Sequence, residues 1–369
     1  MKQNLLILNA SLSGSNRFLF ESLKKRGWNL IVKDVPIPAR YKLWSLLKTF
    51  NFNKSKWGNA YRDYLGRYTI TPSVFRERSR ICERYLASHS HEYDLILQIG
   101  SLFAPSLKSI NKKYVIFSDY TTRLAEKHFP EWAPLSSKRQ SDELLELQKG
   151  LYQRAAMVFT TSNNTRRSMI SDYGVREERS MTVGYGLPFS VFPHAEKKQY
   201  DRKTILFIGN NFKRKGGFTL LEAFKNVRNK IKDVRLIIIG PNQVLAEVEG
   251  VEWKGHIKDR DMIGDFLNKS SIFAMPSFCE PFGLVFLEAM SYRLPCIGSR
   301  VDAMPEIVEE GKTGFLVNAG DADDLGRKIT LLLEDKKLME TMGEAGAKRV
   351  KERFTWDKVA EKIMEAKYV

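Results

Sequence analysis

Residues 273–299 have the sequence FAMPSFCEPFGLVFLEAMSYRLPCIGS, which predicts a buried strand, a turn and a helix in succession. The strand is expected over 272–275, and Pro281 and Gly283 are typical of the turn that follows it. From Leu284 onward apolar residues occupy nearly every helical face, as in a helix buried in a core. Strands that alternate with helices in this way indicate a parallel sheet covered by helices.

The same alternation continues along most of the 369 residues, a length that suggests two domains. Residues 188–202 interrupt it with two prolines, several charges and no clear period, so they are expected to form a linker. Strands are expected at 5–8, 94–99, 114–117, 157–160 and 182–185, then at 205–208, 234–239, 272–275, 295–298 and 314–317. Helices are expected at 16–25, 138–155, 165–173, 218–229 and 260–268 and from 284.

Composition limits the class of protein. Apolar residues make up 43% of the chain, enough for two cores, and no apolar run reaches the roughly 18 residues that span a membrane. The first apolar run is about five residues long, too short for a signal peptide, and is expected to be a strand. Cys82, Cys279 and Cys296 match no metal site, so buried, reduced thiols and a cytoplasmic location are expected.

The turn before Leu284 is a candidate anion site. The first N–H groups of a helix lack internal partners and suit a phosphate, and Gly283 lets the backbone approach an anion closely. Glu288 lies one turn after Leu284 on the same face, and Glu280 lies in the turn; either carboxylate can accept hydrogen bonds from sugar hydroxyls. The alternative is two ordinary solvated glutamates, but a glutamate in so apolar a helix needs a polar partner.

A second strand, turn and helix follow at 207–217, FIGNNFKRKGG, where Gly209 ends the strand. Lys215 lies at the helix entrance, where a cation neutralises the charge that develops on a diphosphate leaving group. For Lys213 and Arg214 a solvated surface loop is the preferred interpretation. The spacing is not that of a P-loop, so no ATPase is predicted.

Two turns in the first half are further candidates. Ser13 and Gly14 follow the first predicted strand, and Asp119 follows the strand at 114–117. Each turn is interpreted either as part of a reaction centre or as an ordinary turn with a helix cap.

These motifs resemble the family 4 glycosyltransferases of the GT-B fold. The similarity is carried by the two glutamates of the pattern E-x7-E at 280 and 288, by the FIG…RKGG turn and by the ending RFTWD at 353–357. The resemblance implies an α/β protein with two facing Rossmann-like domains, at 1–190 for the acceptor and 200–352 for the nucleotide-sugar donor. It also implies that a C-terminal helix, 353–369, packs back on the first domain.

The resemblance implies roles for single residues as well. Glu288 would bind the ribose, Glu280 the donor sugar and Lys215 the diphosphate, and backbone N–H groups at Phe282, Gly283 and Leu284 would contact sugar and phosphate. Such enzymes retain the anomeric configuration and typically use no metal or other cofactor. The catalytic candidates are therefore Glu280, Lys215 and Asp119, and the further substrate-binding candidates are Ser13, Gly14, Gly209, Arg214, Phe282, Gly283, Leu284 and Glu288.

The chain departs from the family's pattern at two positions. Asn210 stands where an arginine is frequent, so charge for the diphosphate would come from Lys213 or Arg214. Ser118 stands where many members have a histidine. The contact that the resemblance would imply there to the donor sugar is therefore in doubt, and Asp119 becomes the candidate for it. Asp321-Ala322-Asp323 is interpreted as the capped start of a helix and not as a metal motif.

A basic insert occupies 40–84, with eleven Lys or Arg against three Asp or Glu and many aromatic residues between them. The net charge of +17 favours polyanionic partners in general. Residues 41–48 space their apolar side chains along one helical face. This pattern fits a helix lying in an anionic membrane surface, a single-strand nucleic-acid site, or a solvated helix with a buried apolar stripe; no nucleic-acid partner is expected.

The motifs and the resemblance together imply a metal-independent, retaining glycosyltransferase that acts on a polysaccharide, lipopolysaccharide or glycolipid acceptor, in the cytoplasm or peripherally at the inner face of the membrane. Two alternatives stay open at this point. One is a nucleotide-sugar epimerase, against which the few histidines argue. The other is a non-catalytic basic protein that binds nucleic acid.

Overall fold

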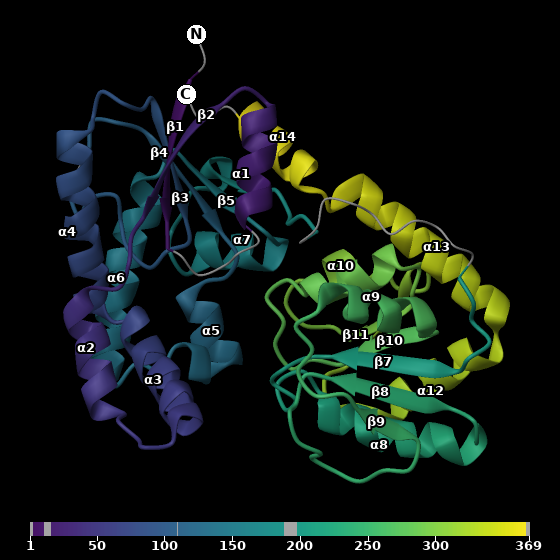
Figure 1. The fold of residues 1–369 in the computed structure, drawn as a ribbon. Coiled ribbons are helices and arrows are strands. Elements are labelled where there is room, and N and C mark those ends of the chain that lie inside the picture. Colours follow the sequence, from purple (N-terminus) through teal and green to yellow (C-terminus); the bar gives the residue numbers. More distant parts are fainter. Residues whose placement is uncertain (1–2, 11–15, 109, 188–197, 367–369) are drawn as a thin grey trace. The chain divides into compact units, whose positions relative to one another are not determined.

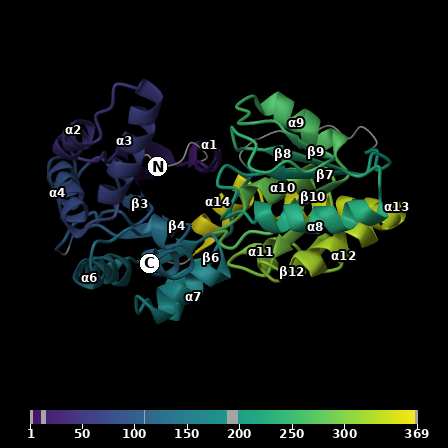
Figure 2. The same cartoon turned by 90° about the horizontal axis from the view of Figure 1, so that it is seen from below.

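A computed structural model of the chain describes residues 3–10, 16–108, 110–187 and 198–366. Its backbone divides into two units: unit 1 comprises residues 1–184 with 359–369, and unit 2 comprises 185–358. From the sequence, the first domain was expected to end at residue 190 and the second to run from 200 to 352. Each unit is an α/β layer structure with its own parallel sheet (Figures 1 and 2).

Among the described residues of unit 1, six parallel strands form one sheet in the order β2-β1-β3-β4-β5-β6. Every residue of β3, β4 and β5, three of the four interior strands, is buried, as expected for a sheet covered on both faces. The strands are β1 (Asn4–Asn9), β2 (Asn29–Asp34), β3 (Leu95–Ile99), β4 (Tyr114–Ser118), β5 (Met157–Thr160) and β6 (Ser180–Thr182).

Helices cover both faces of this sheet, with α4 and α6 on one side and α1 with α14 on the other (Figure 1). From Val359 onward α14 belongs to unit 1, and Lys362 Nζ lies 3.5 Å from the carbonyl oxygen of Val183. The helices are α1 (Asn16–Lys25), α2 (Ala39–Lys48), α3 (Lys54–Thr69), α4 (Pro72–Ser88), α5 (Thr122–His128), η1 (Pro130–Trp132), α6 (Lys138–Arg154), α7 (Asn163–Ser171), η2 (Glu177–Arg179) and α14 (Trp356–Glu365).

Unit 2 contains a second parallel sheet, six-stranded within the described part of the chain, in the order β12-β11-β10-β7-β8-β9. The chain runs outward from β7 through β8 to β9, returns to β10 beside β7, and then runs the other way. The strands are β7 (Thr204–Ile208), β8 (Arg235–Ile239), β9 (Val251–Trp253), β10 (Ile272–Met275), β11 (Cys296–Ser299) and β12 (Gly314–Val317).

The helices of unit 2 also lie on two faces, α8 and α12 on one and α9, α10 and α13 on the other (Figure 1). Asp321 caps α12 by accepting a hydrogen bond from the Asp324 N–H, so the interpretation of that segment as a helix start is confirmed. The helices are α8 (Gly217–Lys230), α9 (Arg260–Lys269), α10 (Leu284–Ser291), α11 (Met304–Ile307), α12 (Ala322–Glu334) and α13 (Lys336–Arg353).

The chain enters and leaves unit 2 side by side. The Leu187 N–H donates to the carbonyl oxygen of Phe354 at 3.1 Å. At Gly186 an added Cβ would lie 2.4 Å from Cγ of Trp356, so the two segments pack too closely there for a side chain. The ring of Tyr185 lies 4.6 Å from that of Trp356 between centroids, which makes this junction an aromatic cluster.

The expected strand at 182–185 was misplaced, because β6 pairs with β5 over Ser180–Thr182. The strands β2 and β9 were missed: both lie at sheet edges and lack the buried run that marked the others. Of the expected linker, residues 188–197 lie outside the described residues. Its end packs on unit 2, where the hydroxyl of buried Tyr200 donates to the carbonyl oxygen of Arg293 at 2.7 Å.

The three cysteines are buried and form no disulfide, as predicted. Burial raises the pKa of the Cys82 thiol to about 12 and also raises that of Cys296. No helix within the described residues is long and apolar enough to cross a membrane.

Candidate functional site

The two motif-bearing turns of unit 2 lie next to each other. They follow β7 and β10, which are neighbours in the sheet and parallel, so both turns leave the same edge. The strands that follow β7 in the chain are added on one side of it as far as β9, and β10 to β12 are added on its other side, so the strand order reverses between β7 and β10. Open α/β sheets bind ligands at the carboxyl ends of strands at such a switch point.

A glycine permits the close approach of these two turns. Gly216 has a left-handed φ of 73°, and a Cβ there would lie 1.9 Å from the carbonyl oxygen of Pro276. The Phe278 N–H donates to the carbonyl oxygen of Arg214 at 2.8 Å, which ties the second turn to the first. Side chains from the two turns can therefore meet in one small volume.

Glu280 is the centre of that volume. It is 6% exposed, and its Oε2 accepts a hydrogen bond from the ammonium of Lys215. Oε2 also lies 3.7 Å from Arg214 Nη1. The Lys215 and Arg214 side chains are only 13% and 10% exposed. Two cations from the first turn thus hold one carboxylate of the second away from water.

Neighbouring groups fix this cluster in place. The Glu280 N–H donates to Oδ2 of Asp302 at 2.8 Å, and Arg214 also donates to the carbonyl oxygen of Cys279. Burial lowers the pKa of Lys215, with Arg214 adding to the effect and Glu280 opposing it. A lysine so placed is held by its partner and not by solvation.

The cluster keeps hydrogen-bonding capacity for a ligand. Among the described residues all the polar contacts of the Glu280 carboxylate are made by Oε2, so Oε1 is left to accept further hydrogen bonds. The Lys215 ammonium has three donors, of which Glu280 takes one. The site therefore offers an acceptor and cationic donors next to each other.

The helices that begin at this edge differ from the other long helices of unit 2. α8 and α10 start at Gly216 and Gly283, both left-handed, and no side chain caps either start. By contrast, aspartate side chains cap α9, α12 and α13. At an uncapped start the partial positive charge of the first turn remains available to an anion.

Glu288 is the second buried carboxylate, 7% exposed on α10. Its Oε1 accepts a hydrogen bond at 3.0 Å from Nη2 of Arg260, whose own side chain is 55% exposed. Burial raises the pKa of Glu288, and Arg260 opposes that rise. The alternative of two solvated glutamates is wrong for both residues.

The structure also corrects the interpretation of the basic residues near Lys215. Lys213 is exposed, as a surface loop requires, but Arg214 is not a surface residue. Asn210, in place of a frequent arginine, lies with its Oδ1 3.1 Å from Nδ1 of His256. Gly209 lies beneath Lys215, where a Cβ would be 3.0 Å from the lysine Cγ.

Two residues near the site were not predicted: Arg260 and Asp302. Arg260 opens a helix and Asp302 follows a strand, each in a segment without a recognisable motif. Both pair with residues that were predicted, Arg260 with Glu288 and Asp302 with Glu280.

Asp119 is the described candidate of unit 1, exposed at the carboxyl end of β4. It does not cap α5; the hydroxyl of Thr121 does so by accepting from the Leu124 N–H. The main-chain oxygen of Asp119 accepts hydrogen bonds from Thr161 and Thr165, at 3.1 and 3.0 Å. The other candidates of this unit, Ser13 and Gly14, lie outside the described residues.

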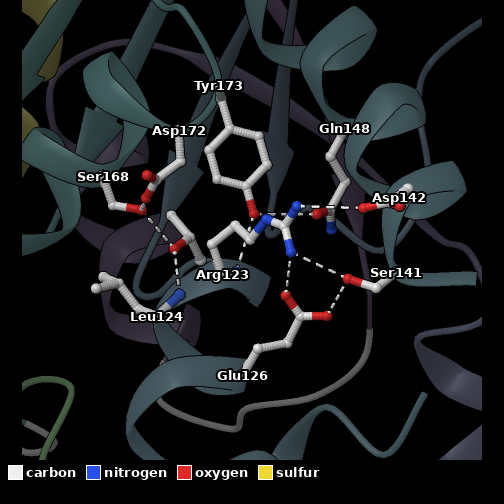
Figure 3. A network of polar contacts seen from close by, with 10 residues as sticks. Arg123, Leu124, Glu126, Ser141, Asp142, Gln148, Ser168, Asp172 and Tyr173 are labelled. Atoms are coloured by element: carbon white, nitrogen blue, oxygen red, sulfur yellow. Dashed lines mark hydrogen bonds and ion pairs between the residues drawn. The ribbon is translucent and has the colours of Figure 1, made fainter. Parts of the chain in front are cut away.

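A polar network next to Asp119 fixes the helix that follows it (Figure 3). Arg123 on α5 donates to Glu126 Oε2 at 2.8 Å and to Ser141 Oγ on α6 at 3.1 Å. Its main-chain N–H donates to the Tyr173 hydroxyl at 3.1 Å. These contacts hold the turn that carries Asp119 against two other segments of unit 1.

No group of three or more His, Cys, Asp or Glu side chains in the described part of the chain is placed to hold a metal ion. The candidate site of unit 2 is instead a cluster of one carboxylate with two cations beside two uncapped helix starts. A second carboxylate, Glu288, lies one turn into α10.

Residues 191–349, all within unit 2, match the model of a family described as "Glycosyl transferases group 1". The N-acetyl-alpha-D-glucosaminyl L-malate synthase of Bacillus anthracis is 32% identical over 174 residues, which are 44% of this chain and 45% of that protein. The MMP alpha-(1->4)-mannosyltransferase of Mycolicibacterium hassiacum is 27% identical over 78% of this chain and 73% of its own length. The first five curated relatives are matched over only 30% to 58% of their length.

The structure of Anabaena Alr3699/HepE in complex with UDP-glucose superposes with a TM-score of 0.64 at 16% identity, covering 98% of both chains. The chain has the GT-B fold. The expected fold, with a C-terminal helix that returns to the first domain, is thereby confirmed. None of these three matches is named as an epimerase or as a nucleic-acid-binding protein.

Proposed function

We propose that the chain transfers a glycosyl group from a nucleoside-diphosphate sugar to an acceptor, as a retaining enzyme of glycosyltransferase family 4. The observation that carries this proposal is the buried Glu280 carboxylate with Lys215 and Arg214, beside uncapped helix starts, within the segment that matches the group 1 glycosyl transferases. Donor binding in the structural neighbour named above, which holds UDP-glucose, supports the choice of a nucleotide sugar.

In this proposal the diphosphate lies at the start of α10. The main-chain N–H groups at Phe282, Gly283 and Leu284 donate to it, and Lys215 and Arg214 neutralise the charge that grows as it leaves. Lys215 can keep one hydrogen bond to Glu280 while its other two donors reach the phosphates. Gly209 permits this arrangement because its missing side chain leaves room for the lysine stem.

The two carboxylates bind the hydroxyl-bearing parts of the donor. Glu280 offers Oε1 to hydroxyls of the transferred sugar, and Glu288 accepts from the ribose. Each bond to a charged acceptor is worth about 1.5–3 kcal/mol where the acceptor is already out of water. In unit 1, Asp119 is assigned to the reaction centre, and Ser13 and Gly14 are assigned to substrate binding.

In the transfer step the bond from the anomeric carbon to the diphosphate oxygen breaks, and a bond from that carbon to the acceptor oxygen forms. The acceptor proton passes to the leaving phosphate on the same face, so the anomeric configuration is retained. Cations and helix N–H groups supply the positive charge, and no metal is required. The acceptor belongs to polysaccharide, lipopolysaccharide or glycolipid synthesis in the cytoplasm.

The test is a thermal-shift screen over UDP-, GDP- and ADP-sugars, followed by measurement of nucleoside diphosphate release with candidate acceptors. A donor at 100 times its Kd stabilises the protein by about 2.7 kcal/mol. Glu288→Ala should lose most of this shift, whereas Glu334→Ala, an exposed glutamate of α12, should keep it. A chain stabilised by no nucleotide sugar, or one that converts the sugar without releasing nucleotide, would refute the proposal.

A further inference from the structure

The helix α2 exposes its apolar side chains instead of burying them. Leu43, Trp44 and Leu47 are 60%, 49% and 65% exposed, and Phe50 just after the helix is 60% exposed. Ser45 is the buried residue of this helix. The interpretation of the segment as a solvated helix with a buried apolar stripe is therefore wrong.

The exposed apolar side chains of the helix form one surface, here called the α2 face: Leu43, Trp44, Leu46 and Leu47. Phe50 follows the helix, and its ring lies 5.4 Å between centroids from that of Trp57 on α3. At 3.6 residues per turn the side chains of the α2 face occupy an arc of about 160°, into which Arg40, ion-paired with Glu77, also falls near one end of the helix. Ser45 points to the opposite side, toward the body of unit 1, where α2 lies beside α3 (Figure 1). The α2 face thus points away from the protein that carries it.

Lysines border the α2 face on both sides. On the helical wheel Lys42 falls next to Leu46 at one edge of the arc, and Lys48 next to Trp44 at the other, with its Nζ 4.9 Å from the centroid of the Trp44 ring. Residues 35–62 contain six Lys or Arg and no Asp or Glu. An apolar arc bordered by cations, in an acid-free segment, is the pattern of a helix that lies in a membrane interface.

The geometry points to an anionic lipid bilayer as the partner of the α2 face, with α2 lying in the plane of the headgroups. Leucines then enter the acyl boundary, Trp44 lies at headgroup level, and Lys42 and Lys48 extend to the phosphates. A second copy of the chain fits poorly, because facing α2 segments would bring like charges together. Single-stranded nucleic acid fits less well, because the face is mostly leucine and offers bases only one stacking surface, the ring of Trp44.

The test is co-sedimentation of the full chain with phosphatidylglycerol-containing vesicles and with pure phosphatidylcholine vesicles at low salt, without donor or acceptor. Its outcome is therefore independent of the proposed transferase reaction. The wild type should sediment with the anionic vesicles, should bind neutral ones at least about tenfold more weakly, and should be released as salt rises.

Two pairs of variants separate the apolar from the charged contribution. Leu43→Ser with Leu47→Ser should weaken partitioning by about tenfold or more per leucine; its control is Leu331→Ser, an exposed leucine of α12 that is 45% accessible. Lys42→Glu with Lys48→Glu should weaken it about tenfold or more; its control is Lys225→Glu with Lys230→Glu, exposed lysines of α8 that give the same net charge.

Brominated lipids give a readout of depth, because bromine quenches only tryptophans that enter the bilayer boundary. Trp44→Phe should still sediment but lose most of the quenching. The proposal is overturned if the wild type ignores anionic vesicles at low salt, or if the control variants weaken binding as much as the α2 variants. It is also overturned if Leu43→Ser with Leu47→Ser abolishes a dimer or RNA binding and leaves vesicle binding intact.

Discussion

Glu280 and Glu288 are equally buried, at 6% and 7% exposure, yet their surroundings differ. Glu280 faces two cations whose side chains are only 10% and 13% exposed, and both come from the turn after β7. Within the described part of the chain Glu288 has a single cationic partner, Arg260 on α9, whose side chain is more than half exposed. The first carboxylate belongs to a closed ion cluster, and the second has a partner that solvent can replace.

The difference shows that burial alone does not define how a carboxylate acts. Removing one member of a closed cluster leaves an uncompensated buried charge, so stability and ligand binding should change together. Where the partner is exposed, the protein tolerates its loss and the carboxylate remains available to a ligand. Stability and binding should therefore separate at Glu288 but not at Glu280.

The largest effect is expected for Lys215→Ala. It should lower the free energy of unfolding by about 3 kcal/mol, because Glu280 loses its closest buried partner. Under the proposed function it should also reduce turnover by about 100-fold or more. Urea unfolding and the rate of nucleotide release measure the two effects.

The double variant Lys215→Met with Glu280→Gln is the control. It removes both charges, so stability should return while turnover stays low. If Lys215→Ala has wild-type stability, Arg214 alone compensates the charge of Glu280. Glu280 would then resemble Glu288 in tolerating the loss of a cationic partner.

A smaller loss of stability is expected for Gly216→Ala, which tests the contact that brings the cluster together. Its Cβ would collide with the main-chain oxygen of Pro276, so the free energy of unfolding should fall by at least about 2 kcal/mol. Donor binding should be lost as well. Gly311→Ala is matched to it, with φ of 72° against 73° but no atom within 4 Å of the added Cβ. That control should cost only about 1 kcal/mol. Equal losses in urea unfolding would mean that backbone conformation, and not the close approach, accounts for the glycine.

Glu288→Gln should separate binding from stability. Donor affinity should fall by roughly tenfold, measured by titration calorimetry, because the ribose loses a charged acceptor. The folded protein should become slightly more stable, by roughly 2 °C in Tm at neutral pH, because the neutral amide avoids the desolvation that raises the pKa of Glu288.

The pH dependence of that gain follows from the sign of the shift. A carboxyl whose pKa is higher in the folded state destabilises it fully above the folded pKa, and the effect disappears as pH falls below the unfolded value of about 4.3. The difference in Tm between variant and wild type should therefore close toward pH 4. A gap that widens in acid would contradict the assignment. Arg260→Ala should change donor affinity less than about threefold.

The smallest effect is expected from chelation. Turnover should be unchanged in excess EDTA, because Lys215, Arg214 and the start of α10 supply the positive charge for the leaving diphosphate. A loss of turnover that Mg²⁺ or Mn²⁺ restores would assign the charge compensation to a metal and would leave the cluster around Glu280 a purely structural role.

The sequence predicts the strands of the two sheets best where they are buried on both faces. β10 and β5 have the expected bounds because every residue is apolar or small and buried, whereas the edge strands β2 and β9 carry mixed side chains that resemble loops. The glutamates and Lys215 were identified because a glycine turn between a strand and a helix marks them. The pairing of Lys215 with Glu280 was not, since it depends on which strands are neighbours.

Arg214 shows the limit of local interpretation most clearly. In the sequence it is one cation among three in a basic turn, and nothing there distinguishes it from exposed Lys213. Its burial follows from Gly216, which brings the first turn against the second. The exposed apolar arc of α2 was equally out of reach, because an amphipathic pattern does not reveal whether its apolar side meets a core or an outer partner.

The hydrogen bond between Leu187 and Phe354, with Trp356 packed over Gly186, makes unit 2 a continuous stretch of chain whose two ends meet. In topological terms it is a cassette inserted into unit 1, ending three residues into the last helix, α14. A segment with adjoining ends can be exchanged between related chains through two nearby junctions, without rerouting the host. Recombination at 185 and 358 therefore offers a route to chimaeras that combine the α2 face of this chain with the nucleotide-binding half of another.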